Sequence, residues 1–152
     1  MTNRFNPYEL NFGLVKPLID CGNAVQAGLE KSLNELVKIR ASQINGCAVC
    51  LHMHAAEARK AGETDERMLM LDAFRESPLF SAREKAALAW TEALTLLTRT
   101  HAPDAVYEEV AEHFTPEEMI SLTLMIGVIN AFNRIGVGFR LGHQPSQVRA
   151  AA

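Results

Sequence analysis

The chain has 152 residues, of which 48% are apolar, and carries a net charge of −3. A sequence of this size and composition is expected to fold as one globular domain, residues 1–152, with a core large enough to be stable without disulfide cross-links. Its mild acidity and the lack of a long basic run argue against a nucleic-acid-binding surface. We expect the two basic pairs, Lys38 with Arg40 and Arg83 with Lys85, to lie on solvated helix faces.

The N-terminal residues lack the apolar core of a signal peptide, and no uninterrupted apolar run of about 20 residues follows that would span a bilayer. We therefore expect a cytoplasmic protein with no membrane partner. Because a reducing compartment disfavours permanent disulfides, the close pair Cys47 and Cys50 is expected to be catalytic, redox-sensing or metal-binding. Cys21 stands apart and is expected to be a small core residue.

Apolar residues recur at helical spacing along most of the chain, and strand signals are nearly absent. Pro17 is expected to bend or interrupt the first helix. The second helix ends at Asn45-Gly46, and the third ends at Gly62, which can adopt the left-handed cap conformation. The predicted helices cover about 7–22, 29–44, 47–62, 64–74, 81–98, 104–114 and 119–141.

Capping residues mark the helix starts in the second half of the chain. Thr64 and Asp65 open a short helix, and Asp104 is predicted to cap another. The segments 81–84 and 115–118 have the pattern of a capping box. The last helix is apolar on nearly every side, so we expect it at the centre of the core or partly covered by another subunit.

Several other side chains are expected to serve the core. Trp90, Met68 and Met70 are predicted to pack in the core or at an interface. The asparagines of the last helix are predicted to be buried and hydrogen-bonded, and its arginines likewise. These residues are Asn130, Asn133, Arg134 and Arg140. The isolated histidines, His101, His113 and His143, are expected at the surface or at helix caps.

Cys47, Cys50 and His54 share one face of the third predicted helix, and His52 points away from it. The unpaired amides of a first helical turn favour a thiolate, and His54 lies one turn beyond Cys50, where it can exchange a proton with that thiol. A sulfenic acid formed on Cys50 by a peroxide could condense with Cys47. The residues alone allow a redox dithiol, half of a zinc site or coincidence, and the lack of a second cysteine pair favours the dithiol.

Glu35, Cys47, Cys50 and His54 form the pattern Glu-x11-Cys-x2-Cys-x3-His, which resembles the alkylhydroperoxidase D group of the carboxymuconolactone decarboxylase superfamily. The similarity covers about residues 30–142 and includes the segments 44–47, 58–64, 83–94 and 129–134. The resemblance implies an all-α bundle of about six to eight helices that assembles into a homo-oligomer, a trimer or a hexamer. It also implies a peroxidase-type reaction at the dithiol, without a bound cofactor or metal.

The resemblance further implies the role of each site residue. Cys50 would be the thiol attacked by a hydroperoxide, Cys47 the resolving thiol, and Glu35 with His54 a proton relay. An external dithiol, such as a lipoyl-bearing protein, would then restore the pair. The helix position alone would favour Cys47 as the more reactive thiol, whereas the nearness of His54 favours Cys50. Val49 stands where the best-characterised members have a further histidine.

By helical phase Glu35 lies opposite the apolar stripe of its helix, which predicts a solvated carboxylate. A catalytic role for Glu35 therefore requires that this side of the helix lines a cleft, for example at a subunit interface. The alternative functions are a decarboxylase acting on a lactone, which has no need of a redox pair, and a redox-sensing or binding subunit without turnover.

Overall fold

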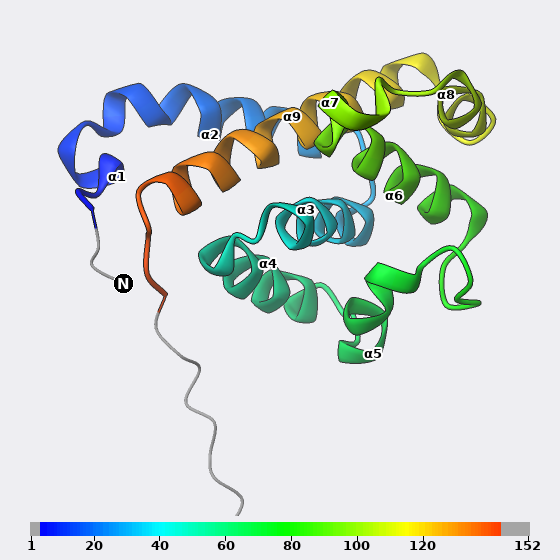
Figure 1. Ribbon diagram of the computed structural model, residues 1–152, viewed down its shortest axis with the longest axis horizontal. Coiled ribbons are helices and arrows are strands. Elements are labelled where there is room, and N and C mark those ends of the chain that lie inside the picture. Colours follow the sequence, from blue (N-terminus) through cyan, green and yellow to red (C-terminus); the bar gives the residue numbers. More distant parts are fainter. Residues whose placement is uncertain (1–3, 144–152) are drawn as a thin grey trace, which may run out of the picture.

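The computed structural model describes residues 4–143, and within this range the chain forms nine α-helices and one 3-10 helix but no strand (Figure 1). The all-α prediction is confirmed. The expected six to eight helices are too few, because two predicted helices each divide in two. The helices are α1 (Pro7–Leu10), α2 (Phe12–Gln26), α3 (Lys31–Asn45), α4 (Ala48–Lys60), α5 (Asp65–Leu69), η1 (Met70–Ala73), α6 (Ala82–Thr95), α7 (Leu97–Thr100), α8 (Asp104–Ala111) and α9 (Pro116–Gly138).

The first predicted helix breaks at Asn11 and not at Pro17. Asn11 has φ −155° and ψ 81°, outside the helical region, and Asn6 caps α1 by accepting a hydrogen bond from the Tyr8 amide at 3.0 Å. Pro17 lies inside α2 with its side chain exposed. A proline removes a single backbone hydrogen bond, and here the packing of α2 along α9 outweighs that loss.

Helix α3 is the centre of the molecule. It contacts α4, α6 and α9, and every residue from Leu33 to Ser42 is buried. Two apolar clusters flank α3, one shared with α6, α8 and α9, the other with α4, η1 and α6. Because α3 is covered all round, polar residues on its less apolar side are also buried.

Helix α9 packs one face into the core and leaves the opposite face exposed. Met125, Ile126 and Ile129 are buried, whereas Ile120 and Leu124 are 61% and 46% exposed. Helix α9 has 23 residues, and the mean hydropathy of an 18-residue window within it is 1.5. By length and composition it could cross a membrane, contrary to the expectation that the chain has no such segment. In this structure 44% of that window is buried within the protein, and the core helices of soluble proteins have the same length and composition.

The predicted caps are confirmed at three of four helix starts. Thr64 accepts from the Arg67 amide, and Ser81 with Glu84 and Thr115 with Glu118 form complete capping boxes. Asp104, however, is the first residue of α8 and not its cap, because Pro103 occupies the cap position.

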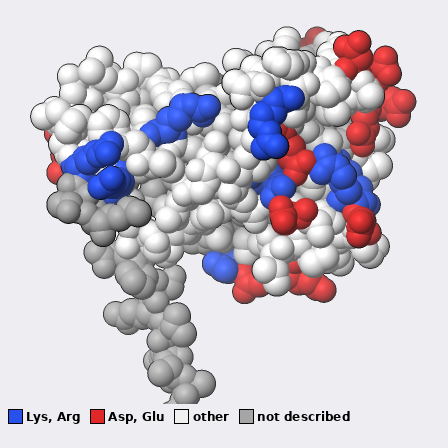
Figure 2. All heavy atoms as spheres, in the orientation of Figure 1, with Lys and Arg blue, Asp and Glu red and all other residues white. Residues whose placement is uncertain are grey.

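The prediction that the basic pairs lie on solvated faces is wrong for Lys38 and Arg40, whereas Arg83 and Lys85 are half-buried. Lys38 and Arg40 are 7% and 8% exposed. Arg40 binds Glu92 at 2.5 Å and Asp72 at 2.8 Å. Arg83 binds Glu30 and Glu118, and its guanidinium lies 3.8 Å from the centre of the Phe114 ring. The partners come from distant helices, so local patterning does not predict them. In the view of Figure 2, basic and acidic side chains lie next to one another on the right-hand half of the molecule, whereas the basic side chains on the left have few acidic neighbours.

Candidate active site

Cys47 and Cys50 form a disulfide at the start of α4. Gly46 ends α3 in the left-handed conformation, with φ 66°, and Cys47 then takes the N-cap position of α4. The Cys47 amide donates to the Ser42 carbonyl at 3.0 Å, which holds this turn against α3. Both cysteines are buried, with 0% and 4% of their surface exposed. The turn therefore presents both sulfur atoms at a helix N-terminus, where the backbone amides favour a thiolate once the pair is reduced.

Gly136 of α9 lies directly against the disulfide. A Cβ atom at this position would lie 2.7 Å from the Cys47 sulfur and 3.4 Å from the Cys50 sulfur. Glycine is therefore the residue that lets α9 approach the pair so closely. The sequence analysis did not single out Gly136. A glycine inside a strongly apolar helix is a signal of close packing that could have pointed to it.

Glu35 and His54 meet across the interface between α3 and α4. Glu35 Oε2 lies 3.0 Å from His54 Nδ1, and Glu35 Oε1 accepts a hydrogen bond from Lys38 Nζ at 2.8 Å. Lys38 Nζ also donates to Gln26 Oε1 of α2 at 2.6 Å. The prediction of a solvated Glu35 is wrong, since its side chain is 7% exposed. Glu35 does not itself line the cavity of this site, but its partners His54 and Lys38 both do, within one chain.

The carboxyl group of Glu35 is ionised despite its burial. Burial by itself raises the pKa of Glu35, but the hydrogen bonds from His54 and Lys38 outweigh it, and the pKa lies below its ordinary value. A carboxylate accepts hydrogen bonds and cannot donate them, so His54 presents Nδ1–H to Glu35. Nε2 of a neutral His54 is then left as an acceptor.

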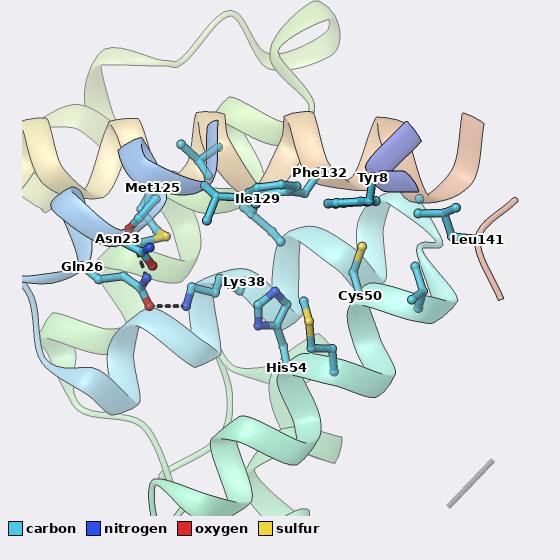
Figure 3. A pocket seen from close by; sticks show the side chains of 16 residues that line it. Tyr8, Asn23, Gln26, Lys38, Cys50, His54, Met125, Ile129, Phe132 and Leu141 are labelled. Carbon is cyan, nitrogen blue, oxygen red and sulfur yellow. Dashed lines mark hydrogen bonds between the residues drawn. The ribbon is translucent and has the colours of Figure 1, made fainter. Parts of the chain in front are cut away.

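A cavity of about 510 Å³ adjoins this group, and Figure 3 shows Cys50, His54 and Lys38 on its wall. Most of its wall is apolar and comes from α2, α4 and α9, including Val49, Met125, Val128, Ile129 and Phe132. Asn23 and Gln26 supply polar groups toward one end (Figure 3). The cavity therefore suits a largely apolar molecule that reaches Cys50.

The sequence analysis missed Tyr8, Gln26 and Lys38 as residues of this site. Tyr8 comes from α1 and lines the same cavity as Cys50 (Figure 3). Burial raises the pKa of Tyr8, so its hydroxyl stays a neutral donor. No local motif predicts that Tyr8, Gln26 and Lys38 line one cavity, because they lie on three different helices.

A buried network of amides anchors the turn before Cys47 to α9. Asn45 donates to Asn130 at 3.0 Å and to Asn133 at 2.9 Å, and Asn133 donates to Ser42 at 2.9 Å. Asn130 and Asn133 are 8% and 1% exposed, which confirms the prediction of buried, hydrogen-bonded asparagines. All of these partners belong to one chain. The network fixes the last turn of α3, from which the disulfide follows.

The other predicted residues lie outside the cavity wall. His52 stacks on His143, with ring centres 4.7 Å apart. Cys21 is half-buried against the core. Arg134 and Arg140 are exposed, contrary to prediction. Trp90 and Met68 pack in the core, as predicted. Within residues 4–143 no group of three or more histidine, cysteine, aspartate or glutamate side chains is arranged to hold a metal ion.

Comparison with known proteins agrees with this geometry. Residues 16–93 match the model of the carboxymuconolactone decarboxylase family. The uncharacterised protein YdfG of Bacillus subtilis (strain 168) is 40% identical over 138 residues, which are 90% of this chain and 94% of YdfG.

Two solved structures share the fold. One is a protein of unknown function from Agrobacterium tumefaciens, proposed to be the antioxidant defence protein AhpD, with 39% identity and a TM-score of 0.91 over 95% of this chain and 100% of that one. The other is a peroxidase-related protein from Silicibacter sp. TM1040, which at 23% identity shows the fold alone, with a TM-score of 0.78 over 92% of this chain and 74% of that one. The chain therefore belongs to the carboxymuconolactone decarboxylase family and has the AhpD-like fold.

Proposed function

We propose that this protein is a thiol-dependent peroxidase that reduces organic hydroperoxides with Cys50 and Cys47. The proposal rests on one observation, which is that three features of the structure lie together. A vicinal cysteine pair at a helix N-terminus, a histidine held by a buried carboxylate, and an apolar cavity adjoin one another. Together they supply a nucleophile, a proton carrier and a space for the substrate.

The chemistry follows from these parts. In the reduced protein His54 takes the proton of the Cys50 thiol, and the thiolate attacks the terminal oxygen of the hydroperoxide. The O–O bond breaks, Cys50 becomes a sulfenic acid, and the departing alkoxide takes the proton from His54 to leave as an alcohol. The Cys47 thiol then attacks the Cys50 sulfur, which forms the disulfide and releases water.

An external dithiol completes the cycle. It reduces the disulfide by two thiol exchanges and is itself oxidised to a disulfide. We propose a lipoyl-bearing protein as this reductant, and a cytoplasmic homo-oligomer, a trimer or a hexamer, as the working form. Glu35 and His54 form the proposed proton relay. Because Val49 replaces the additional histidine of the family pattern, this relay has one member fewer, and we expect slow turnover.

Peroxide consumption with dihydrolipoamide as reductant tests the proposal. The measurement compares wild type with Cys50→Ser, Cys47→Ser and His54→Ala, and Cys21→Ser is the control because Cys21 lies outside the cavity wall. We expect Cys50→Ser to lose turnover, His54→Ala to be slowed by about 10² to 10⁴, and Cys21→Ser to match wild type. Turnover of Cys50→Ser at the wild-type rate would refute the proposal.

Trapping of the intermediate tests the two cysteine roles separately. In Cys47→Ser, one equivalent of cumene hydroperoxide should leave a sulfenic acid on Cys50 that dimedone labels and peptide mass spectrometry locates. In wild type, the same treatment of reduced protein should give the Cys47–Cys50 disulfide. A sulfenic acid found on Cys47 in Cys50→Ser, with rapid peroxide consumption, would reverse the roles. A disulfide that forms without repeated turnover would favour a redox sensor.

A further inference from the structure

Lys38 is a buried cation that binds Glu35, the carboxylate that holds His54 in the proposed relay. Its side chain is 8% exposed, and its ammonium group donates to Glu35 at 2.8 Å and to Gln26 at 2.6 Å. A charge removed from water is costly unless it is paired. An apolar side chain would fill this space without that cost, so the positive charge itself calls for an explanation.

Few other charges face this position. Helix α4 contributes His54 and Cys50, α1 contributes the neutral Tyr8, and α2 contributes the amides of Asn23 and Gln26. The residues that α9 contributes to the described cavity wall are apolar or glycine. The local charge balance therefore depends on Glu35, Lys38, His54 and Cys50.

We propose that Lys38 is a positioning residue that cancels the charge of Glu35, so that the thiolate of Cys50 and the imidazolium of His54 form in a buried site whose net charge is zero. This inference rests on the proposed function. Before the transfer, the Glu35 carboxylate and the Lys38 ammonium cancel, and the thiol and the imidazole are neutral. After the transfer, the carboxylate and the thiolate are balanced by the ammonium and the imidazolium.

Without Lys38 this balance is lost. Glu35 would keep its charge by holding His54 as an imidazolium, and His54 could then no longer accept the thiol proton. Formation of the thiolate would require release of a proton to water and would leave a net negative charge in a buried site. Thiolate formation should therefore need a higher pH when Lys38 is replaced by an uncharged residue.

The test measures the rate of iodoacetamide alkylation of Cys50 against pH, in reduced protein that carries Cys47→Ser. Peptide mass spectrometry separates Cys50 from Cys21. We expect Lys38→Met to move the midpoint of this profile up by about one pH unit or more. Lys38→Arg keeps the charge and should stay closer to the parent than to Lys38→Met. The exposed Lys31 lies on the same helix, and Lys31→Met should leave the midpoint unchanged.

Glu35→Gln should shift the midpoint of the Cys50 alkylation profile in the opposite direction. This variant therefore distinguishes an effect of charge from an effect of packing. It leaves Lys38 as surplus positive charge, so the midpoint should move to lower pH. The double variant, Glu35→Gln with Lys38→Met, removes both charges and should return the midpoint at least halfway toward the parent. Packing damage would instead move both single variants in the same direction and accumulate in the double variant.

The outcomes distinguish this inference from the peroxidase proposal. An unchanged midpoint in Lys38→Met, or an upward shift in Glu35→Gln, would overturn the charge-balancing role whatever the peroxide assay gives. The predicted pair of opposite shifts in a protein that does not consume peroxide would leave the role of Lys38 intact and refute the peroxidase proposal. If Lys38→Met does not fold, Glu35→Gln and the double variant still test the direction in which the alkylation midpoint shifts.

Discussion

Glu35 Oε2 and His54 Nδ1 lie 3.0 Å apart, although the two residues are 19 positions apart in the sequence. Their contact joins helix α3 to helix α4. This contact fixes which nitrogen of His54 faces the cavity, because an ionised carboxylate must accept the proton of the other one. It also makes α3 part of the site, although its local pattern indicates a solvated side. The stability of the fold and the chemistry of the thiols therefore depend on the same buried group.

Glu35→Gln should destabilise the protein and flatten its response to acid. At pH 7 we expect a loss of roughly 3 kcal/mol, because Lys38 remains buried without its carboxylate. The pKa of Glu35 is lowered in the folded state, so its contribution is fully present above its ordinary value of 4.5 and is lost as the pH falls below that value. Urea unfolding between pH 3 and pH 7 should therefore show a shallower slope below pH 4.5 in the variant.

The control for this measurement is Asp20→Asn. Asp20 pairs with Lys16 at the surface, and its side chain is 56% exposed. Its loss should cost less than about 1 kcal/mol. Equal acid slopes in wild type and Glu35→Gln would contradict the assignment of a lowered pKa to Glu35.

Gly136→Ala should destabilise the oxidised protein by about 1–3 kcal/mol, because the added methyl group would meet the Cys47 sulfur at 2.7 Å. Gly127→Ala is a matched control on the same helix, since a Cβ there has no neighbour within 4 Å. It should be neutral or stabilise by up to about 1 kcal/mol. Urea unfolding of both variants checks this, and a harmless Gly136→Ala would show that α9 can move away from the disulfide at little cost.

Asn133→Ala should cost about 2–3 kcal/mol, because it leaves the buried Ser42 hydroxyl and an Asn45 amide hydrogen without their partner. It should also loosen the turn before Cys47, which hydrogen exchange of the Gly46 and Cys47 amides would detect as faster opening. Arg134→Ala, one residue further along α9 and exposed, should change stability by less than about 0.5 kcal/mol. Unchanged exchange in Asn133→Ala would mean that the network does not hold the turn.

Arg40→Met and Arg75→Met compare a buried and an exposed partner of the same carboxylate. Both arginines bind Glu92, but their side chains are 10% and 60% exposed. Arg40→Met should cost about 3 kcal/mol because it removes the buried partner of Glu92 and leaves this carboxylate with the exposed Arg75 alone. Arg75→Met should cost less than about 1 kcal/mol. Thermal unfolding of the two variants measures the difference, and similar losses would show that burial does not set the strength of these ion pairs.

The elements that sequence reasoning predicted correctly are those formed by residues close together in the chain. Both capping boxes, the Gly46 turn and the start of α4 depend on contacts three to five residues apart. Errors appear where long-range packing decides the outcome. Pro17 stays inside α2 because α9 supports that helix, and Lys38 is buried because α2 and α4 cover its side of α3.

The helical class of this protein and the shared face of Cys50 and His54 on α4 follow from the sequence, because a helical repeat depends on local spacing, whereas Cys47 lies at the N-cap and not within the helix. Tertiary packing alone brings Glu35 to His54, buries the Glu35–Lys38 pair of α3, and places Gly136 against the disulfide. These contacts join separate helices or depend on the helices that cover α3, so they follow from how the whole core packs. Periodicity along the chain specifies which side of a helix is apolar, but not which helix will cover it.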